Sequence, residues 1–194
     1  MPPVRPTSQE IDRRILDITA GLLAQRGIKD TSVQAVADEA GYSKSGLLRR
    51  FPSKEALVHA ALQQSTQLTN EAIARTDSVP YGHERDAVAV TALAELLFGY
   101  EGYAHLLMAA VTSVPGDAHY EHVYPMGRAL YAMFVPDELL LADVERATRI
   151  TGAIGALVGV ALTYRRGVNA QQAHRFALDT AWNSLGHEGS FPSL

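Results

Sequence analysis

The stretch TSVQAVADEAGYSKSGLLRRFPSKEALV, residues 31–58, decides the fold of the N-terminal part of this chain. Gly41 lies between two short helical patterns. Pro52 ends the second pattern, because the residue before a proline is pushed out of the α region. Ser43 can cap that second helix by accepting a hydrogen bond from one of its first N–H groups. The sequence therefore predicts a helix that ends before Gly41, a tight turn, and a short helix over 44–50.

Helices are also predicted on both sides of this turn. Thr7 and Glu10 have the spacing of a capping box, so a first helix begins near residue 8, and Gly27 ends it. Ser53 caps a further helix over 54–74. Two helices joined by a tight turn that contains glycine form a helix-turn-helix. This motif predicts a DNA-binding domain.

The short helix over 44–50 is polar at its start and basic at its end. It can enter a major groove with Lys44 and Ser45 leading, while Arg49 and Arg50 reach phosphates. Lys54 and the free N–H groups of the next helix can bind another phosphate. The alternative is a bundle of core helices with a solvated basic edge. The residues predicted to contact DNA are Ser32, Gln34, Ser43, Lys44, Ser45, Gly46, Leu48, Arg49, Arg50 and Lys54.

The charge is unevenly divided along the chain. The formal net charge of −4 by itself argues against a nucleic-acid partner. Residues 1–60, however, hold nine Lys and Arg against seven Asp and Glu, a net charge of +2, and the remainder hold eight against fourteen, a net charge of −6. Such asymmetry indicates an anionic partner for one end of the chain and a different role for the other.

The segment over 31–58 resembles the DNA-binding segment of the tetracycline-repressor (TetR) family of bacterial regulators. With the first helix, the resemblance covers roughly the first 60 residues. Beyond them the chain is similar to the family only in its helical character and length. The residues that carry the resemblance, with their spacing, are Thr31, Val36, Ala37, Ala40, Gly41, Ser43, Leu47, Phe51, Lys54 and Leu57.

One part of the motif departs from the family. Members usually carry aromatic residues, often Tyr, just before the position of Phe51, whereas this chain has Leu48, Arg49 and Arg50. The aromatic contacts of the family therefore cannot be transferred. Arginine can replace them with charge-assisted hydrogen bonds. Whether the two arginines meet bases or phosphates stays open.

The resemblance implies a ligand-responsive regulator of transcription, most simply a repressor that leaves a near-palindromic double-stranded DNA operator when a small, largely apolar effector binds. Activation stays open. It also implies a homodimer in which the last two long helices of each subunit form a four-helix bundle. The alternative is a protein that binds or sequesters a small molecule and keeps a vestigial DNA-binding module. That alternative predicts ligand binding without an operator.

The whole chain reads as all-α with about nine helices, because no convincing period-2 alternation and no hairpin signal occur. We expect a helix-turn-helix domain over 1–53, a connecting helix over 54–75, and a ligand-binding and dimerisation domain over 76–194. The connecting helix is predicted to be the one element that runs from the DNA to the second domain. Pro125 should kink or split its helix. A linker is expected over 76–86, and helices over 87–98, 100–113, 117–135, 138–166 and 170–186.

Large, adaptable side chains cluster in the middle of the second domain, which favours a ligand pocket between bundle helices. The alternative is ordinary core packing with some exposed tyrosines. A hydrogen-bonding group of the effector could meet His105 or a tyrosine. The residues predicted to contact the effector are Tyr100, Tyr103, His105, Met108, Tyr120, Tyr124 and Met133.

The uncharged run over 150–164 is shorter than the ~20 residues that span a membrane, so we expect a buried helix in a soluble, cytoplasmic protein with no membrane partner. Gly152, Gly155 and Gly159 in this run can pack closely inside the subunit, but the resemblance favours an interface between subunits. The residues predicted at the dimer interface are Gly155, Val158, Gly159, Leu162, Leu178, Trp182 and Leu185.

Enzymatic and metal-binding patterns are weak. The absence of cysteine excludes disulfides, thiolate catalysis and cysteine-ligated zinc. His119 and His122, beside Asp117 and Glu121, could share one helix face, but no further converging ligand is evident, so surface or loop histidines are the simpler interpretation. The sequence has no nucleophile elbow, no P-loop and no dinucleotide fingerprint. We therefore expect no enzyme, no cofactor and no metal.

Overall fold

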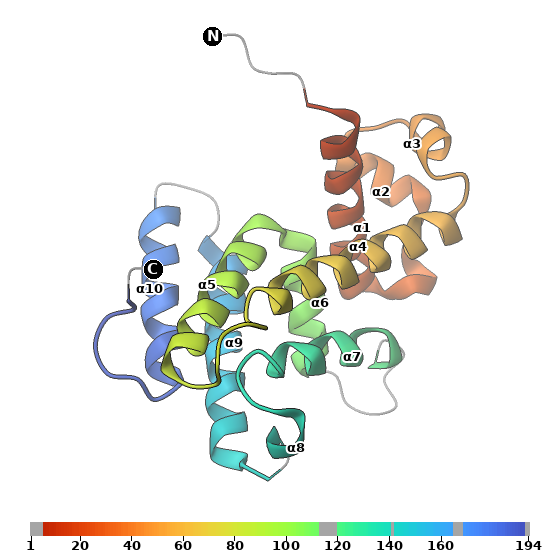
Figure 1. Cartoon of the computed structure of the whole chain (residues 1–194). Helices are drawn as coiled ribbons and strands as arrows, with labels where there is room; N and C mark the ends of the chain where they lie inside the picture. The colour runs from red at the N-terminus through yellow and green to blue at the C-terminus, as the bar shows by residue number, and fades with distance from the viewer. Residues whose placement is uncertain (1–5, 113–119, 141, 165–168, 193–194) are drawn as a thin grey trace.

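The computed structural model describes residues 6–112, 120–140, 142–164 and 169–192, and every regular element among them is a helix. The prediction of an all-α fold is confirmed. The described part contains ten helices (Figure 1), and their bounds are α1 Ser8–Asp30, α2 Val33–Ala40, α3 Lys44–Arg50, α4 Lys54–Ala74, α5 His83–Gly99, α6 Glu101–Thr112, α7 Tyr120–Tyr131, α8 Asp137–Leu140, α9 Val144–Tyr164 and α10 Ala170–Ser184.

The first four helices begin where the sequence predicts, and α2, α3 and α4 also end there, whereas α1 extends past its predicted end at Gly27. Thr7 and Glu10 form a complete capping box at the start of α1. Gly27, at φ 82°, interrupts α1, although a further helical turn continues to Asp30. Gly41 ends α2 in the left-handed region at φ 75°, which costs little for a residue without Cβ. This turn sets the angle between α2 and α3, and the predicted bounds of α3 and α4 are confirmed.

A small apolar core joins these helices. Leu47 is the one fully buried side chain of α3, with no exposed surface. It packs with Ile15 of α1, Val36 of α2 and Leu57 of α4. Because α3 has seven residues, which is too short for a stable isolated helix, this packing determines where it lies.

The second domain is a larger helical bundle. α5 lies among α4, α6, α9 and α10, and α9 and α10 run side by side (Figure 1). Leu93 and Leu97 of α5, Leu107 of α6 and Leu157 of α9 have no exposed surface. α9 is long and apolar enough, by length and composition, to span a membrane. One face of α9 packs in the core against α5, α6 and α10, but only 33% of its most apolar window is buried, so the prediction of a buried helix holds for that face alone.

Several predicted boundaries in this domain are wrong. The stretch 138–166 is split into α8 and α9, because the Asp143 carboxylate accepts the Arg146 N–H (2.9 Å) and starts a new helix. α7 ends at Tyr131, before the predicted residue 135, and it continues through Pro125 without being split there. The linker is shorter than predicted, since α5 begins at His83.

Buried polar groups explain the short linker. The Arg85 guanidinium donates to the carbonyl oxygens of Thr76 (2.7 Å), Val79 (2.8 Å) and Met133 (2.8 Å). The Asp86 carboxylate pairs with Arg146 at 2.6 Å. The predicted linker therefore contains an organised turn that ties the start of α5 to the segment just after α7 and to α9.

The two domains meet chiefly where α1 crosses α6. A Cβ placed on Gly102 would lie 1.7 Å from the carbonyl oxygen of Asp17, so the backbones of the two helices touch. The Asp17 carboxylate also accepts the N–H of Tyr103 at 3.1 Å, in the first turn of α6. The prediction that the fourth helix is the only element running from the DNA to the second domain is therefore wrong. α1 makes a second connection through α6.

Candidate functional site

The start of α3 presents its polar side chains to solvent. Lys44 and Ser45 are exposed. The Ser43 hydroxyl accepts the N–H of Gly46 at 3.1 Å and lies 3.2 Å from the Ser45 hydroxyl. A Cβ on Gly46 would lie 3.1 Å from the Ser43 hydroxyl oxygen, so a small residue there leaves room for the cap. Ser43 and Gly46 thus shape the helix start, while Lys44 and Ser45 can reach a partner.

The end of α3 separates two adjacent arginines. Arg49 is exposed. Arg50 instead turns back to α1, where its Nη1 donates to Asp12 Oδ1 (2.5 Å) and to Ser8 Oγ (3.0 Å). Leu48 is half-buried. The structure therefore does not place the two predicted phosphate contacts, Arg49 and Arg50, in equivalent positions.

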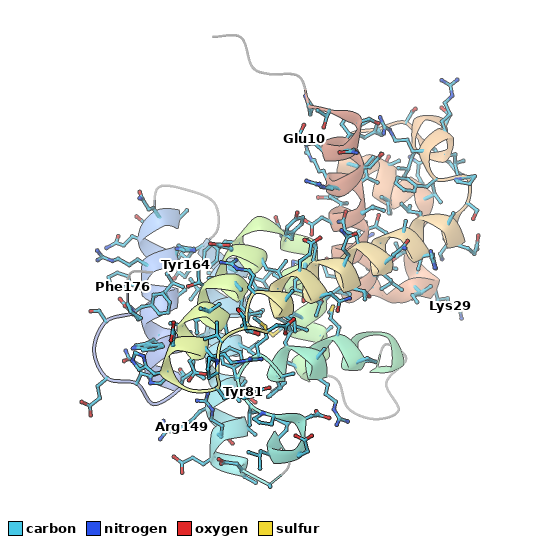
Figure 2. The ribbon with its side chains drawn as sticks, viewed as in Figure 1. Glu10, Lys29, Tyr81, Arg149, Tyr164 and Phe176 are labelled. Atoms are coloured by element: carbon cyan, nitrogen blue, oxygen red, sulfur yellow. The ribbon has the colours of Figure 1, made fainter. Side chains whose placement is uncertain are left out.

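Backbone N–H groups at the start of α4 already donate hydrogen bonds to side chains of the same segment. The Ser53 hydroxyl accepts the N–H of Ala56 at 3.1 Å. Hydrogen bonds from the backbone N–H of Glu55 and from the Ser53 hydroxyl lower the pKa of the Glu55 carboxyl. Lys54 donates to the carbonyl oxygen of Lys29 at 2.9 Å, where α1 ends (Figure 2). The N–H groups predicted to be free for a phosphate are thus partly satisfied within the chain.

The two predicted contacts before and within α2 are exposed. The Ser32 hydroxyl caps α2 by accepting the N–H of Ala35 at 3.1 Å. The Gln34 amide donates to the Asp38 carboxylate at 2.6 Å, one turn later on the same helix. Both side chains lie at the start of α2, at the opposite end of that helix from Gly41 and the turn to α3.

The predicted effector contacts are divided between the core and a groove. Tyr103 and Met133 lie in the core, at 1% and 0% exposure. Burial raises the pKa of the Tyr103 phenol, and its hydroxyl bonds the Thr69 hydroxyl of α4 at 2.8 Å. Met108 packs half-buried against this core. The predicted contacts Tyr120 and Tyr124 lie outside the residues whose side chains are described, as do Asp117, His119, Glu121 and His122 of the weak metal pattern.

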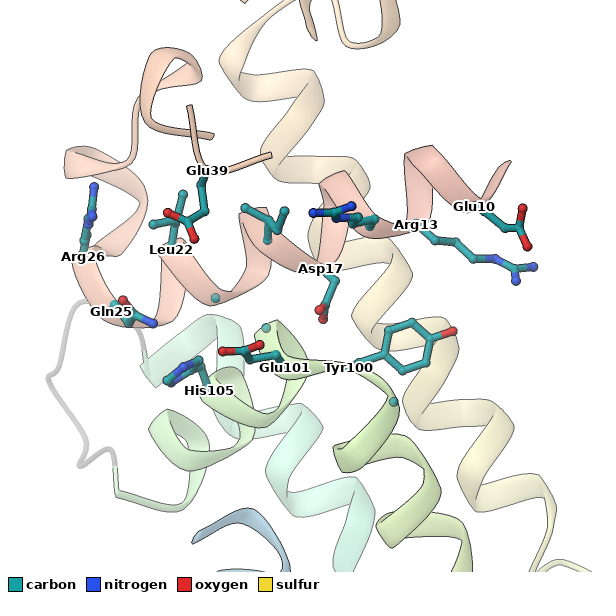
Figure 3. Close-up of a pocket in the computed structure, with 15 residues that line it drawn as sticks. Glu10, Arg13, Asp17, Leu22, Gln25, Arg26, Glu39, Tyr100, Glu101 and His105 are labelled. Atoms are coloured by element: carbon teal, nitrogen blue, oxygen red, sulfur yellow. The ribbon is translucent and has the colours of Figure 1, made fainter. Parts of the chain in front are cut away.

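Tyr100 and His105 line an open groove of about 790 Å³ between α1 and α6 (Figure 3), and Tyr100 also packs half-buried against this core. The groove is rich in charged side chains of α1, among them Arg13, Asp17 and Arg26. It is therefore a polar site that contains residues of both domains, unlike the apolar pocket that the sequence predicts.

The predicted dimer contacts also fall into two groups. Val158, Trp182 and Leu185 are buried inside the subunit, at 1%, 1% and 4% exposure. The His187 ring stacks on Trp182 with the ring centroids 3.9 Å apart, so the segment after α10 covers this side chain. The half-buried members of the predicted set, which remain available to a second subunit, are Gly155, Gly159, Leu162 and Leu178.

Sequence reasoning missed the residues that join the elements. Asp12 binds Arg50, and Asp17 caps α6, although each lies far from its partner in the chain. Neither pairing follows a helical spacing or a known motif. The adjacent Arg49 and Arg50 look alike in the sequence, and no local signal tells which of them is held within the chain.

Comparisons with known proteins match the N-terminal segment to a family of regulators. Residues 15–61 match the family described as bacterial regulatory proteins, tetR family. The chain is 42% identical over 64 residues to the HTH-type transcriptional repressor KstR2 of Rhodococcus jostii (strain RHA1), across 32% of this chain and 31% of that protein. It is 31% identical over 78 residues to the uncharacterized HTH-type transcriptional regulator YvkB of Bacillus subtilis (strain 168), across 40% and 39%. The chain thus spans about a third of the length of the curated relatives it matches.

The fold extends the likeness beyond the first domain. A solved TetR-like transcriptional regulator from Rhodococcus sp. RHA1 superposes with a TM-score of 0.51 at 20% identity, and the match covers 95% of this chain and 100% of that one. At that identity the likeness concerns the fold alone. The helix-turn-helix segment of this chain thus matches the TetR family of bacterial regulatory proteins, and the fold of the whole chain is similar to that of a TetR-like regulator.

Proposed function

We propose that the protein is a homodimeric, ligand-responsive transcriptional regulator that binds a near-palindromic DNA site and represses transcription from it. The observation that carries this proposal is the exposed start of α3, where Lys44 and Ser45 project from a helix that Leu47 holds in place. This is the geometry of a helix that enters a major groove by its N-terminal residues. A relative that matches this segment is named a transcriptional repressor.

The dimer is supported by an uncovered surface on α9 and α10. A Cβ added to Gly155 or Gly159 would meet no atom within 4 Å, so that side of α9 is open. Tyr164 and Phe176, labelled in Figure 2, are each 50% exposed. Small residues beside exposed aromatics allow two helix pairs to approach closely. A two-fold pair of subunits would also present two copies of α3 to successive major grooves, about 34 Å apart.

Effector binding in the second domain would change DNA binding through two hydrogen bonds of α6, one to α4 and one to α1. Tyr103 takes part in both, because its hydroxyl bonds Thr69 of α4 and its N–H donates to Asp17 of α1. We propose that an effector near Tyr103, Met108 and His105 shifts α6, and that α1 and α4 follow. A typical coupling of about 1–3 kcal/mol would then weaken DNA binding about 5- to 150-fold.

Selection of bound duplexes from a random library tests the DNA-binding part of the proposal. We expect enrichment of a near-palindromic sequence, an affinity that falls steeply with salt, and a dimer in sedimentation at micromolar concentration. A protein that enriches no sequence, yet binds small molecules in thermal-shift assays, would instead be a small-molecule binding or sequestering protein. Ligands that bind the second domain without changing DNA affinity would refute the regulatory part alone.

A further inference from the structure

The bridge between Arg50 and α1 joins two helices that are distant in sequence. Arg50 is the last residue of α3, whereas Ser8 and Asp12 lie in the first turns of α1. The Nη1 atom of Arg50 is 2.5 Å from Asp12 Oδ1 and 3.0 Å from Ser8 Oγ. The Arg50 and Asp12 side chains are 29% and 38% exposed, so the pair is partly shielded from solvent.

Recognition helix α3 has few other attachments to the rest of the domain. Its apolar contacts come from Leu47, which is fully buried, and from the half-buried Tyr42 and Phe51, which lie just before and just beyond the helix. Within the described residues, Arg50 makes the side-chain hydrogen bonds that join α3 to another helix. Apolar contacts have no preferred direction, so by themselves they allow the axis of α3 to rotate. The hydrogen bonds of Arg50 to α1, at the end of α3, restrict that rotation.

Helix electrostatics favour the bridge at its α3 end. Arg50 places a positive charge in the last turn of α3, where the helix dipole stabilises it. A charge-assisted hydrogen bond of this kind is also stronger than a neutral one. By pairing Arg50 with Asp12, the chain uses a cation of its DNA-binding domain for an internal contact.

We propose that Arg50 is a positioning residue, which sets the direction in which Lys44 and Ser45 enter the major groove, and that Arg49 is the arginine that contacts DNA. The inference rests on the proposed DNA-binding function and assigns different roles within the same site. The two roles can be told apart by the salt dependence of DNA binding. A side chain that contacts phosphate releases counterions and so steepens this dependence, whereas a side chain that only orients α3 does not. Loss of Arg50 lowers sequence preference, whereas loss of Arg49 lowers the salt dependence.

The first experiment compares Arg50→Ala with the matched control Arg49→Ala. The probes are the duplex that wild-type protein enriches from a random library and an unrelated duplex of the same length. We expect Arg50→Ala to weaken binding to the enriched duplex about 3- to 10-fold, to leave the unrelated duplex unchanged, and to keep the salt slope. Arg49→Ala should weaken both and lower the slope by about one unit. A slope that falls equally in the two variants would overturn the assignment.

A charge exchange separates positioning from direct contact. Asp12→Arg and Arg50→Asp each remove the bridge, while the double variant restores an opposite pair with its charges exchanged. We expect the double variant to recover most of the sequence preference that Arg50→Asp loses. Failure to recover, together with a reduced salt slope, would show that Arg50 itself contacts DNA.

A stability cycle tests the bridge without DNA. In thermal unfolding of wild type, Asp12→Ala, Arg50→Ala and the double variant, the double variant should lose less Tm than the two single losses combined. Additive losses would mean that the two residues do not interact and would overturn the inference. A wild type that enriches no duplex would reject the proposed function, whereas the cycle would still report on the bridge.

Discussion

Two helix contacts of α1 differ in kind. Against α6, the backbones of Gly102 and Asp17 touch, and Gly21 continues the close approach, since its added Cβ would lie 3.2 Å from the Cα of Gly102. Against α3, the contact depends on side chains, namely Leu47 in the core and Arg50 at the rim. The joint between the domains is therefore rigid and intolerant of added atoms. α3, the proposed recognition helix, is held by side chains that can be changed one at a time.

This difference separates stability from recognition. A change in the joint should destabilise the whole chain, because backbone atoms cannot move aside without shifting a helix. A change at α3 should mainly alter DNA binding, with smaller effects on unfolding. The following variants test that separation, from the largest expected effect to the smallest.

Gly102→Ala should be the most damaging substitution. Its Cβ would lie 1.7 Å from a backbone oxygen of α1, so the two helices must separate. We expect a loss of about 3 kcal/mol or more in the free energy of unfolding, measured by urea denaturation. Gly99→Ala is the matched control, since its Cβ meets no atom within 4 Å. Equal stability of Gly102→Ala and wild type would show that the joint is loose.

Leu47→Ala removes the buried anchor of α3. Truncation of a buried leucine costs about 2–5 kcal/mol, and the low end is expected here, because a short helix at the edge of a small core can settle into the space. DNA binding should be lost almost completely, as the helix loses its position. Chemical unfolding and binding to an enriched duplex are measured on the same variant. Retained sequence preference would contradict the anchoring role.

Tyr103→Phe removes the hydroxyl bond between α6 and Thr69 of α4. We expect a loss of about 1 kcal/mol near neutral pH, since one buried hydrogen bond disappears and the ring stays. The alkaline limb of the stability curve should also change. Because burial raises the pKa of Tyr103 in the folded state, wild-type stability is full below the unfolded pKa of about 10 and falls as the pH rises above it. Tyr103→Phe should show a shallower decline, and an identical decline would contradict the assignment.

Lys54→Ala should have the smallest effect on unfolding. Its ammonium group has three N–H donors, so it can keep the bond to the Lys29 carbonyl oxygen and still meet a phosphate. We expect about equal weakening for all DNA sequences and a salt slope lower by about one unit, measured by titration at several salt concentrations. An unchanged slope would mean that Lys54 serves only to hold the end of α1.

The sequence alone predicts the first domain almost residue by residue. Gly41, Ser43, Pro52 and Ser53 are local signals, because caps, left-handed turns and proline stops depend on neighbouring residues only. The exposed positions Lys44 and Ser45 follow from the same pattern. The second domain carries fewer such signals, and there the predicted boundaries miss α8 and the turn around Arg85.

Only the tertiary structure decides how each polar or apolar side chain is used. Arg49 and Arg50 are the same residue type in adjacent positions, yet only Arg50 meets Asp12 of α1. Tyr103 and Trp182 looked available to an effector or a second subunit, but the helices around them bury both. Helical periodicity identifies residues on a common face, whereas burial and pairing depend on which distant element covers that face. Sequence therefore determined the helices of the first 60 residues and their resemblance to the TetR family, and three-dimensional packing determined which side chains are buried or paired.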